Sequence, residues 1–145
     1  MTTNPLIASK FSLDVQGITA DFFSTASGFS NTSEIVTHQA VDSAGNSVLH
    51  KIPGDLTWSE ITLERGITGD MSLWDWRQEV VNGDMDSARR DGSIVMYDST
   101  LTEIARWNFV RGWPSAWTGP DVGADNQAVA IESITIAHEG LERAL

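Results

Sequence analysis

Short stretches in which apolar and polar residues alternate constrain the fold of this chain more than any other feature. A period of two places every second side chain on one face of an extended strand. Residues 11–16 alternate in this way, with apolar side chains at the odd positions, and residues 104–110 do so again at Ala105, Trp107 and Phe109. Both stretches therefore predict strands with one buried face.

Five further strands are predicted where β-branched and aromatic residues gather between turn signals. They cover residues 20–26, 31–40, 56–65, 94–97 and 128–138, and the first of them follows Gly17 as the second arm of a hairpin. In residues 56–65 the apolar positions shift phase between Trp58 and Ile61. This shift predicts a bulge, or a strand that buries different faces at its two ends.

Turn-forming residues predict two long irregular connections. The first runs from Asp42 to Asp55, where turn residues at 42–47 are followed by the Ile-Pro-Gly-Asp stretch at 52–55. The second runs from Gly112 to Asp125 and contains three glycines and two prolines. Proline presets φ and glycine tolerates positive φ, so both residues favour turns.

Only residues 70–82 have the pattern of a helix. Leu73, Trp76 and Val80 recur at helical spacing, Asp70 suits the start of a helix, and Gly83 suits the residue after its end. The sequence thus predicts a mainly β fold: two packed antiparallel sheets that form a barrel or sandwich, with one flanking helix at about residues 70–82. Because 145 residues with 41% apolar content suffice for one core, we expect a single domain over residues 1–145.

Composition excludes several classes of function. The chain has no cysteine, which excludes disulfides, thiolate metal sites and cysteine nucleophiles. Its formal charge of −11 repels phosphates, so we expect no specific nucleic-acid binding. Residues 1–5 lack the features of a signal peptide, and no apolar run approaches the roughly 20 residues of a membrane span. We therefore expect synthesis as a soluble chain in the cytoplasm and no membrane insertion of the monomer.

The three histidines do not form a recognised catalytic or metal-binding motif. His38, His50 and His138 lack the spacing of a metal helix. His138 precedes Glu139, and this pair is read more simply as a local salt bridge than as the acid and base of a small hydrolase. Residues 121–126 lack the spacing and the closing glutamate of a calcium loop.

Glu60 and Glu64 stand four residues apart on a predicted strand and can share a face. Their simplest environment is solvent or an arginine of a neighbouring subunit, rather than a glycosidase site. The glycines match no nucleotide-binding motif, and no serine lies in a nucleophile elbow. We expect no catalytic residue, no cofactor and no metal.

Six tryptophans are unusual in a chain of this length. A group such as Trp107, Trp113 and Trp117 can lie in a core, anchor an interface or stack on sugars. Core or interface is the simpler interpretation. The alternative function is a carbohydrate-binding β-sandwich module that uses surface tryptophans.

Several short motifs follow one another in a recognisable order. They are FSLDVQG at 11–17 with FFSTASG at 22–28, HKIPG at 50–54, ITLERGITGD at 61–70, Trp76 within the helix, WNFVRGWPSAWTGP at 107–120 and AIESITIAHEGLE at 130–142. In this order they resemble the inner tail-tube proteins of contractile phage tails, R-type pyocins and extracellular contractile injection systems. More distantly, the chain is similar to the type VI secretion tube protein.

The chain departs from the pattern of this family in three places. At Ala116 the family often has a lysine or another polar residue, the pair Arg111-Gly112 replaces a more usual pair, and the 42–47 loop is idiosyncratic. If these residues contact a neighbouring subunit, that contact differs in this chain from the family's.

The resemblance implies a structural subunit rather than an enzyme. Six subunits would form a ring by continuing their sheets into a shared inner barrel, and rings would stack into a hollow tube inside a contractile sheath on a baseplate. The lumen would carry cargo, an effector protein or phage DNA, and the particle would be a phage tail, a pyocin or an injection system. The ring or stacking interface is expected at Lys51, Ile52, Pro53, Gly54, Glu64, Arg65, Gly66, Trp76, Trp113, Pro114, His138 and Glu139.

Overall fold

The structure is a computed structural model that describes residues 7–120 and 130–145. The chain divides into two compact units: residues 30–59 form the smaller unit, and the remainder forms the larger one. The expectation of a single domain over residues 1–145 stays a prediction.

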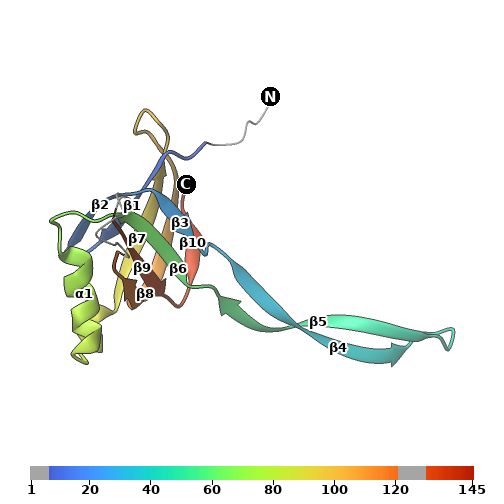
Figure 1. The fold of residues 1–145 in the computed structure, drawn as a ribbon. Helices are drawn as coiled ribbons and strands as arrows, with labels where there is room; N and C mark the ends of the chain where they lie inside the picture. The colour runs from blue at the N-terminus through green and yellow to red at the C-terminus, as the bar shows by residue number, and fades with distance from the viewer. Residues whose placement is uncertain (1–6, 121–129) are drawn as a thin grey trace. The chain divides into compact units, whose positions relative to one another are not determined.

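One antiparallel sheet builds the larger unit, with its strands in the order β2-β1-β7-β8-β9-β6-β3 and with β10 also paired to β8 (Figure 1). The strands are β1 (Lys10–Val15), β2 (Ile18–Phe23), β3 (Thr25–Ser27), β6 (Ile61–Gly66), β7 (Arg90–Tyr97), β8 (Glu103–Thr118), β9 (Ile131–Ala137) and β10 (Leu141–Arg143). The end strands of this order, β2 and β3, do not pair with each other, so the sheet does not close into a barrel. The mainly β, sandwich-like fold is confirmed, and the closed barrel that the prediction allowed is not formed.

The long strand β8 joins the two halves of this sheet. Its first part pairs with β7, and from Trp113 onward it pairs with β9. At the change of partner, Arg111 has a φ of 50°, and a Cβ on Gly112 would lie 2.4 Å from the Phe109 ring. The backbone of Gly112 thus lies so close to the Phe109 ring that there is no space for a side chain at position 112.

Part of the predicted irregular connection at 112–125 is therefore wrong. Residues 112–118 belong to β8, because Pro114 lies beside a register shift, where a missing N–H is tolerated. Residues 121–125 lie outside the described residues.

The core lies where the halves of the sheet face each other. It collects side chains from both halves and from the helix: Leu13, Val15, Ile18, Phe23, Ile61, Leu63, Leu73, Trp76, Ile94, Phe109, Ile134 and Ile136. Burial of this apolar surface is the main source of the stability of the unit.

The predicted flanking helix is confirmed as α1 (Ser72–Val81). Asp70 accepts a hydrogen bond from the Ser72 N–H at 3.0 Å, and Gly83 follows the helix with a φ of 84°. Trp76 is buried, and its indole N–H donates to the Ala88 carbonyl at 2.8 Å. That carbonyl closes α2 (Met85–Ala88), a single helical turn that the sequence pattern does not predict.

The smaller unit is a hairpin of β4 (Asn31–Val41) and β5 (Ser47–Trp58). Its turn is short: the Asp42 carboxylate accepts hydrogen bonds from the N–H groups of Ala44 and Asn46, and Gly45 has a φ of 84°. The predicted long connection from Asp42 to Asp55 is therefore wrong beyond residue 46. A two-stranded ribbon leaves each strand one open edge, so a proline at position 53 costs no bond of the ladder.

Two other predicted boundaries change. Residues 56–65 are not one strand: β5 ends at Trp58 and β6 begins at Ile61 in the other unit. The phase shift at these residues marks a break between strands rather than a bulge. The predicted strand at 20–26 is likewise divided at Ser24 into β2, which pairs with β1, and β3, which pairs with β6.

Candidate assembly surfaces

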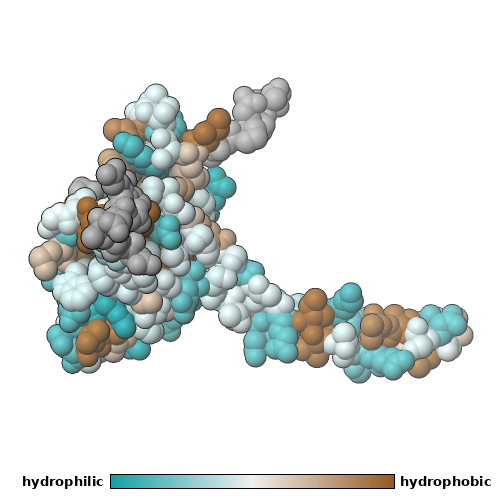
Figure 2. Space-filling model, viewed as in Figure 1, coloured by the Kyte–Doolittle hydropathy of each residue, from teal (hydrophilic) through white to brown (hydrophobic). Residues whose placement is uncertain are grey.

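The hairpin of residues 30–59 presents apolar side chains on both of its faces. Directly paired residues share a face, so His38 and His50 lie together between the apolar pairs Val36–Ile52 and Ala40–Val48. The other face carries Ile35, Thr37, Gln39, Leu49, Lys51 and Pro53. Ile35 is 64% exposed and Leu49 is 61% exposed. Figure 2 shows apolar and polar patches following each other along this ribbon.

Such a ribbon lacks a core of its own. Isolated two-stranded hairpins are marginally stable in water, and exposed strand edges with apolar side chains favour pairing with another chain. The predicted interface residues Lys51, Ile52, Pro53 and Gly54 all lie exposed on β5. Lys51 has no side-chain partner among the described residues.

Three other predicted interface residues are buried within the larger unit. Trp76 is 1% exposed, Pro114 less than 2%, and Arg65 2%. These side chains therefore lie beneath the surface of the larger unit, and their part in an interface stays a prediction.

Arg65 holds two carboxylates at one edge of the sheet. Its Nε donates to Glu132 Oε1 at 2.7 Å, and its Nη1 donates to Asp70 Oδ2 at 3.3 Å. The Nη2 group is buried with no hydrogen-bond partner among the described residues. The Ser72 backbone N–H, with lesser contributions from the Ser72 hydroxyl and Arg65, lowers the pKa of Asp70 although burial opposes this. The trio therefore combines two carboxylates with a single guanidinium.

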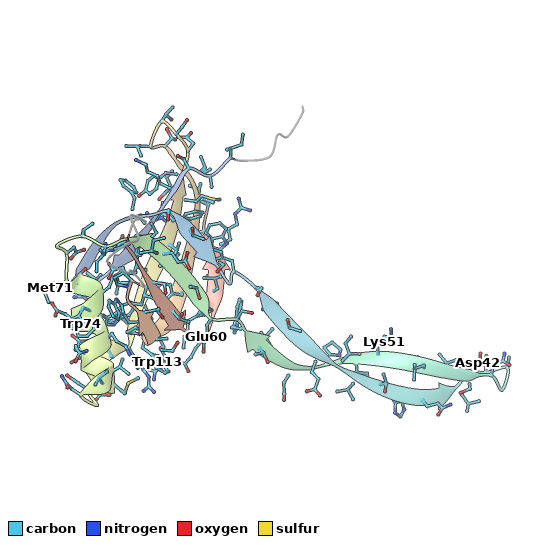
Figure 3. All side chains as sticks on the ribbon, viewed as in Figure 1. Asp42, Lys51, Glu60, Met71, Trp74 and Trp113 are labelled. Atoms are coloured by element: carbon cyan, nitrogen blue, oxygen red, sulfur yellow. The ribbon has the colours of Figure 1, made fainter. Side chains whose placement is uncertain are left out.

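A pocket of about 210 Å³ opens beside this trio. We call it the tryptophan pocket, and its lining consists of Ile67, Thr68, Asp70, Met71, Trp74, Trp117 and Glu132. The Trp74 and Trp117 rings meet edge to face with their centroids 4.8 Å apart, and the Trp117 indole N–H donates to Glu132 Oε2 at 3.2 Å. Met71 and Trp74 lie at the start of α1 (Figure 3). Sequence reasoning missed this pocket, because the two tryptophans are distant in the chain and only the fold brings them together.

The remaining predicted interface residues lie at separate places on the larger unit. Glu64 is half-buried and Gly66 is exposed on β6. Trp113 is half-buried on β8 and pairs with Ala137, next to His138. His138 is half-buried with its ring 6.4 Å from that of Phe109, and the exposed Glu139 forms an ion pair with Arg111.

The described residues contain few groups arranged for metal binding or catalysis. Within residues 7–120 and 130–145, no group of three or more histidines or carboxylates could hold a metal ion. No helix in this part of the chain has the length and apolar character needed to cross a membrane. The calcium-loop candidate at residues 121–126 lies outside the described residues. Glu60, the other carboxylate considered, lies just before β6 and accepts a hydrogen bond from the Ser115 hydroxyl at 3.3 Å.

Solved structures with a similar fold come from contractile injection systems and related particles. The chain is similar to a chain in the structure of the anti-feeding prophage (AFP) baseplate, 6-fold symmetrised, with a TM-score of 0.76 and 17% identity over 98% of this chain and 97% of that one. It is also similar to a chain in the PVC sheath-tube complex of an extracellular contractile injection system in the extended state. There the TM-score is 0.70 and the identity 23% over 96% and 90% of the two chains.

A more distant similarity is to Hcp1 from Flavobacterium johnsoniae, with a TM-score of 0.55 and 15% identity over 93% of this chain and 94% of that one. A search of curated protein sequences finds no match. The model of the T4-like virus tail tube protein gp19 family matches residues 8–142, nearly the whole chain. The chain thus belongs to the T4-like tail tube protein gp19 family, and it is a structural subunit of a phage tail-like tube.

Proposed function

We propose that six copies of this chain form a ring and that rings stack into a hollow tube. The tube would lie inside a contractile sheath and rest on a baseplate. The similar chains come from structures described as a sheath-tube complex and as a 6-fold symmetrised baseplate, which supports these partners and this symmetry.

One observation carries the proposal: the hairpin of residues 30–59 has exposed apolar side chains on both faces. No core within the hairpin accounts for Ile35, Val41, Leu49 and Leu56, each more than half exposed. Neighbouring copies would cover these side chains and pair the open strand edges, which removes the aggregation hazard of a bare ribbon.

The proposed assembly surfaces comprise the exposed and half-buried residues of the sequence-based set. They are Lys51, Ile52, Pro53, Gly54, Glu64, Gly66, Trp113, His138 and Glu139. Arg65, Trp76 and Pro114 would support these surfaces from within.

The lumen of the tube would pass an effector protein or phage DNA. A formal charge of −11 repels nucleic acid and acidic proteins, so a wall of such subunits would let them slide without sticking. We further propose that the subunit has no catalytic activity, because its residues serve packing and assembly.

Electron microscopy of the purified chain tests the proposal directly. Negative staining should show rings of six subunits or stacked tubes, and analytical ultracentrifugation should show masses in multiples of a hexamer. A chain that stays monomeric at high concentration and binds immobilised glycans would instead support the carbohydrate-binding alternative.

A further inference from the structure

The tryptophan pocket combines an apolar rim with an anionic floor. Ile67, Met71 and Trp74 on the rim are 45%, 59% and 40% exposed and together form a contiguous apolar patch at the pocket. The floor holds the Asp70 and Glu132 carboxylates, and among the described residues they form ion pairs with one guanidinium, that of Arg65.

These properties suit a long cationic side chain with an apolar stem. The faces of tryptophan rings attract cations, and a net negative floor adds a Coulomb attraction. Lysine has a four-carbon stem that packs against apolar walls while its ammonium group reaches an acid. A pocket of about 210 Å³ has room for one such side chain.

The chain itself supplies a suitable lysine. It has only two, and Lys10 already lies over the Phe22 ring, with its Nζ 5.0 Å from the ring centroid. Lys51 is exposed on β5 and has no side-chain partner among the described residues. It shares a hairpin face with the apolar side chains of Ile35, Leu49 and Pro53, which would meet the apolar rim of the pocket.

Arg89 is the other exposed cation without a side-chain partner in the described part of the chain. Its neighbours in sequence are Asp84, Asp86 and Asp91, so its surroundings are acidic rather than apolar. Charge alone does not distinguish Arg89 from Lys51, but the match of apolar surfaces favours Lys51. Arg89 therefore provides a matched control.

We propose that the hairpin of one copy docks on a second copy by inserting Lys51 into the tryptophan pocket. This inference rests on the proposed function, since it names the surface that receives the hairpin in the assembly. It adds a specific pair of contacting elements: β5 of one subunit and the start of α1 in another.

Cross-linking between single-cysteine variants tests the contact, because the natural chain has no cysteine. Lys51→Cys is made in one preparation, and Met71→Cys is made in a second preparation that carries a mass tag. The two are mixed, assembled and treated with a short bismaleimide. A product with the mass of one tagged and one untagged chain can form only between copies.

The expected result is this mixed product in assembled material, and its loss when Arg89→Cys replaces Lys51→Cys. Rings or tubes seen by electron microscopy without the mixed product, or with equal yields for both partners, would overturn the inference and leave the proposed function intact. A wild-type chain that forms no rings or tubes would overturn the proposed function itself.

Charge variants give an independent readout without cysteines. Lys51→Glu should lose the sedimentable tubes, Lys51→Arg should keep them, and Arg89→Glu should keep them as well. Circular dichroism checks that each variant is folded. Tubes of normal length from folded Lys51→Glu protein would contradict the docking of Lys51 in an acidic pocket.

Discussion

The Asp70 side chain has three structural roles. Its carboxylate accepts a hydrogen bond from the Ser72 N–H at the start of α1, pairs with Arg65 and lines the tryptophan pocket. These hydrogen bonds stabilise its ionised form, which is why its pKa is lowered.

Asp70→Asn should therefore destabilise the larger unit by about 1 kcal/mol at pH 7, because a neutral amide loses the ion pair with Arg65 and accepts a weaker hydrogen bond from Ser72. A lowered folded-state pKa contributes stability that is complete above the ordinary value of 3.8 and is lost as the pH falls through the lower folded value. Urea unfolding at several pH values measures the difference from wild type, which should shrink in acid. The exposed Asp86→Asn is the control, and an Asp70→Asn difference that does not vary with pH would contradict this account.

Gly112 sits where β8 changes partner, and its lack of a side chain is a packing requirement. An added Cβ would lie 2.4 Å from Cε2 of Phe109, a core residue that is 1% exposed. Gly112→Ala should lower the free energy of unfolding by about 1 to 3 kcal/mol. Gly69→Ala, where nothing lies within 4 Å of the added atom, should change it far less. Thermal unfolding of both variants gives the comparison, and equal losses would contradict the packing argument.

In the β4–β5 hairpin, the backbone geometry of the ribbon depends on two consecutive residues of β5, Pro53 and Gly54. Pro53 pairs with Ile35 next to the register shift in β4, and a Cβ on Gly54 would lie 3.1 Å from Cγ2 of Val36. Replacing both with alanine should restore an N–H at one position and crowd β4 at the other, which alters the twist of the ribbon.

The Pro53→Ala, Gly54→Ala double variant should stay folded and form rings but few long tubes. Electron microscopy with length measurement checks this, and Gly45→Ala in the turn, where nothing lies within 4 Å but φ is positive, separates turn strain from packing. Tubes of normal length from the double variant would argue against a role of this stretch in stacking.

At the scale of the whole molecule, the chain leaves the larger unit after residue 29 and returns to it at residue 60. The Ser59 N–H donates to the Ser30 carbonyl at 3.0 Å, so the hairpin begins and ends at adjacent points of the backbone. The larger unit has its own core, and none of the residues of that core lies in 30–59.

Replacing residues 31–58 with a short Gly-Ser linker should therefore leave the larger unit folded with cooperative unfolding, because no core side chain is removed. The same variant should form no tubes, since the proposed contact between copies is lost. Circular dichroism and sedimentation measure the two outcomes separately. Loss of folding would show that the hairpin stabilises the larger unit, and persistent tubes would show that assembly does not use the hairpin.

Much of the architecture could be predicted from local sequence pattern. The alternation at residues 11–16, the helical stripe of Leu73 and Trp76 and the glycine at 83 each report a local environment, and β1 and α1 follow them. The sequence pattern predicted irregular connections at Pro53 and Pro114, but both residues lie in strands. A proline signals a break only where its N–H would have been bonded, and that depends on which strand lies beside it.

The sequence by itself determined the class of the fold and the family, because periodic burial and an ordered set of short motifs are properties of the chain read in order. Only the tertiary structure decided where the surfaces lie. Arg65, Trp76 and Pro114 turned out to be interior, and Trp74, Trp117 and Glu132 came together as a pocket. The physical reason is that burial and proximity between distant residues depend on strand register and pairing, and local pattern carries no record of either.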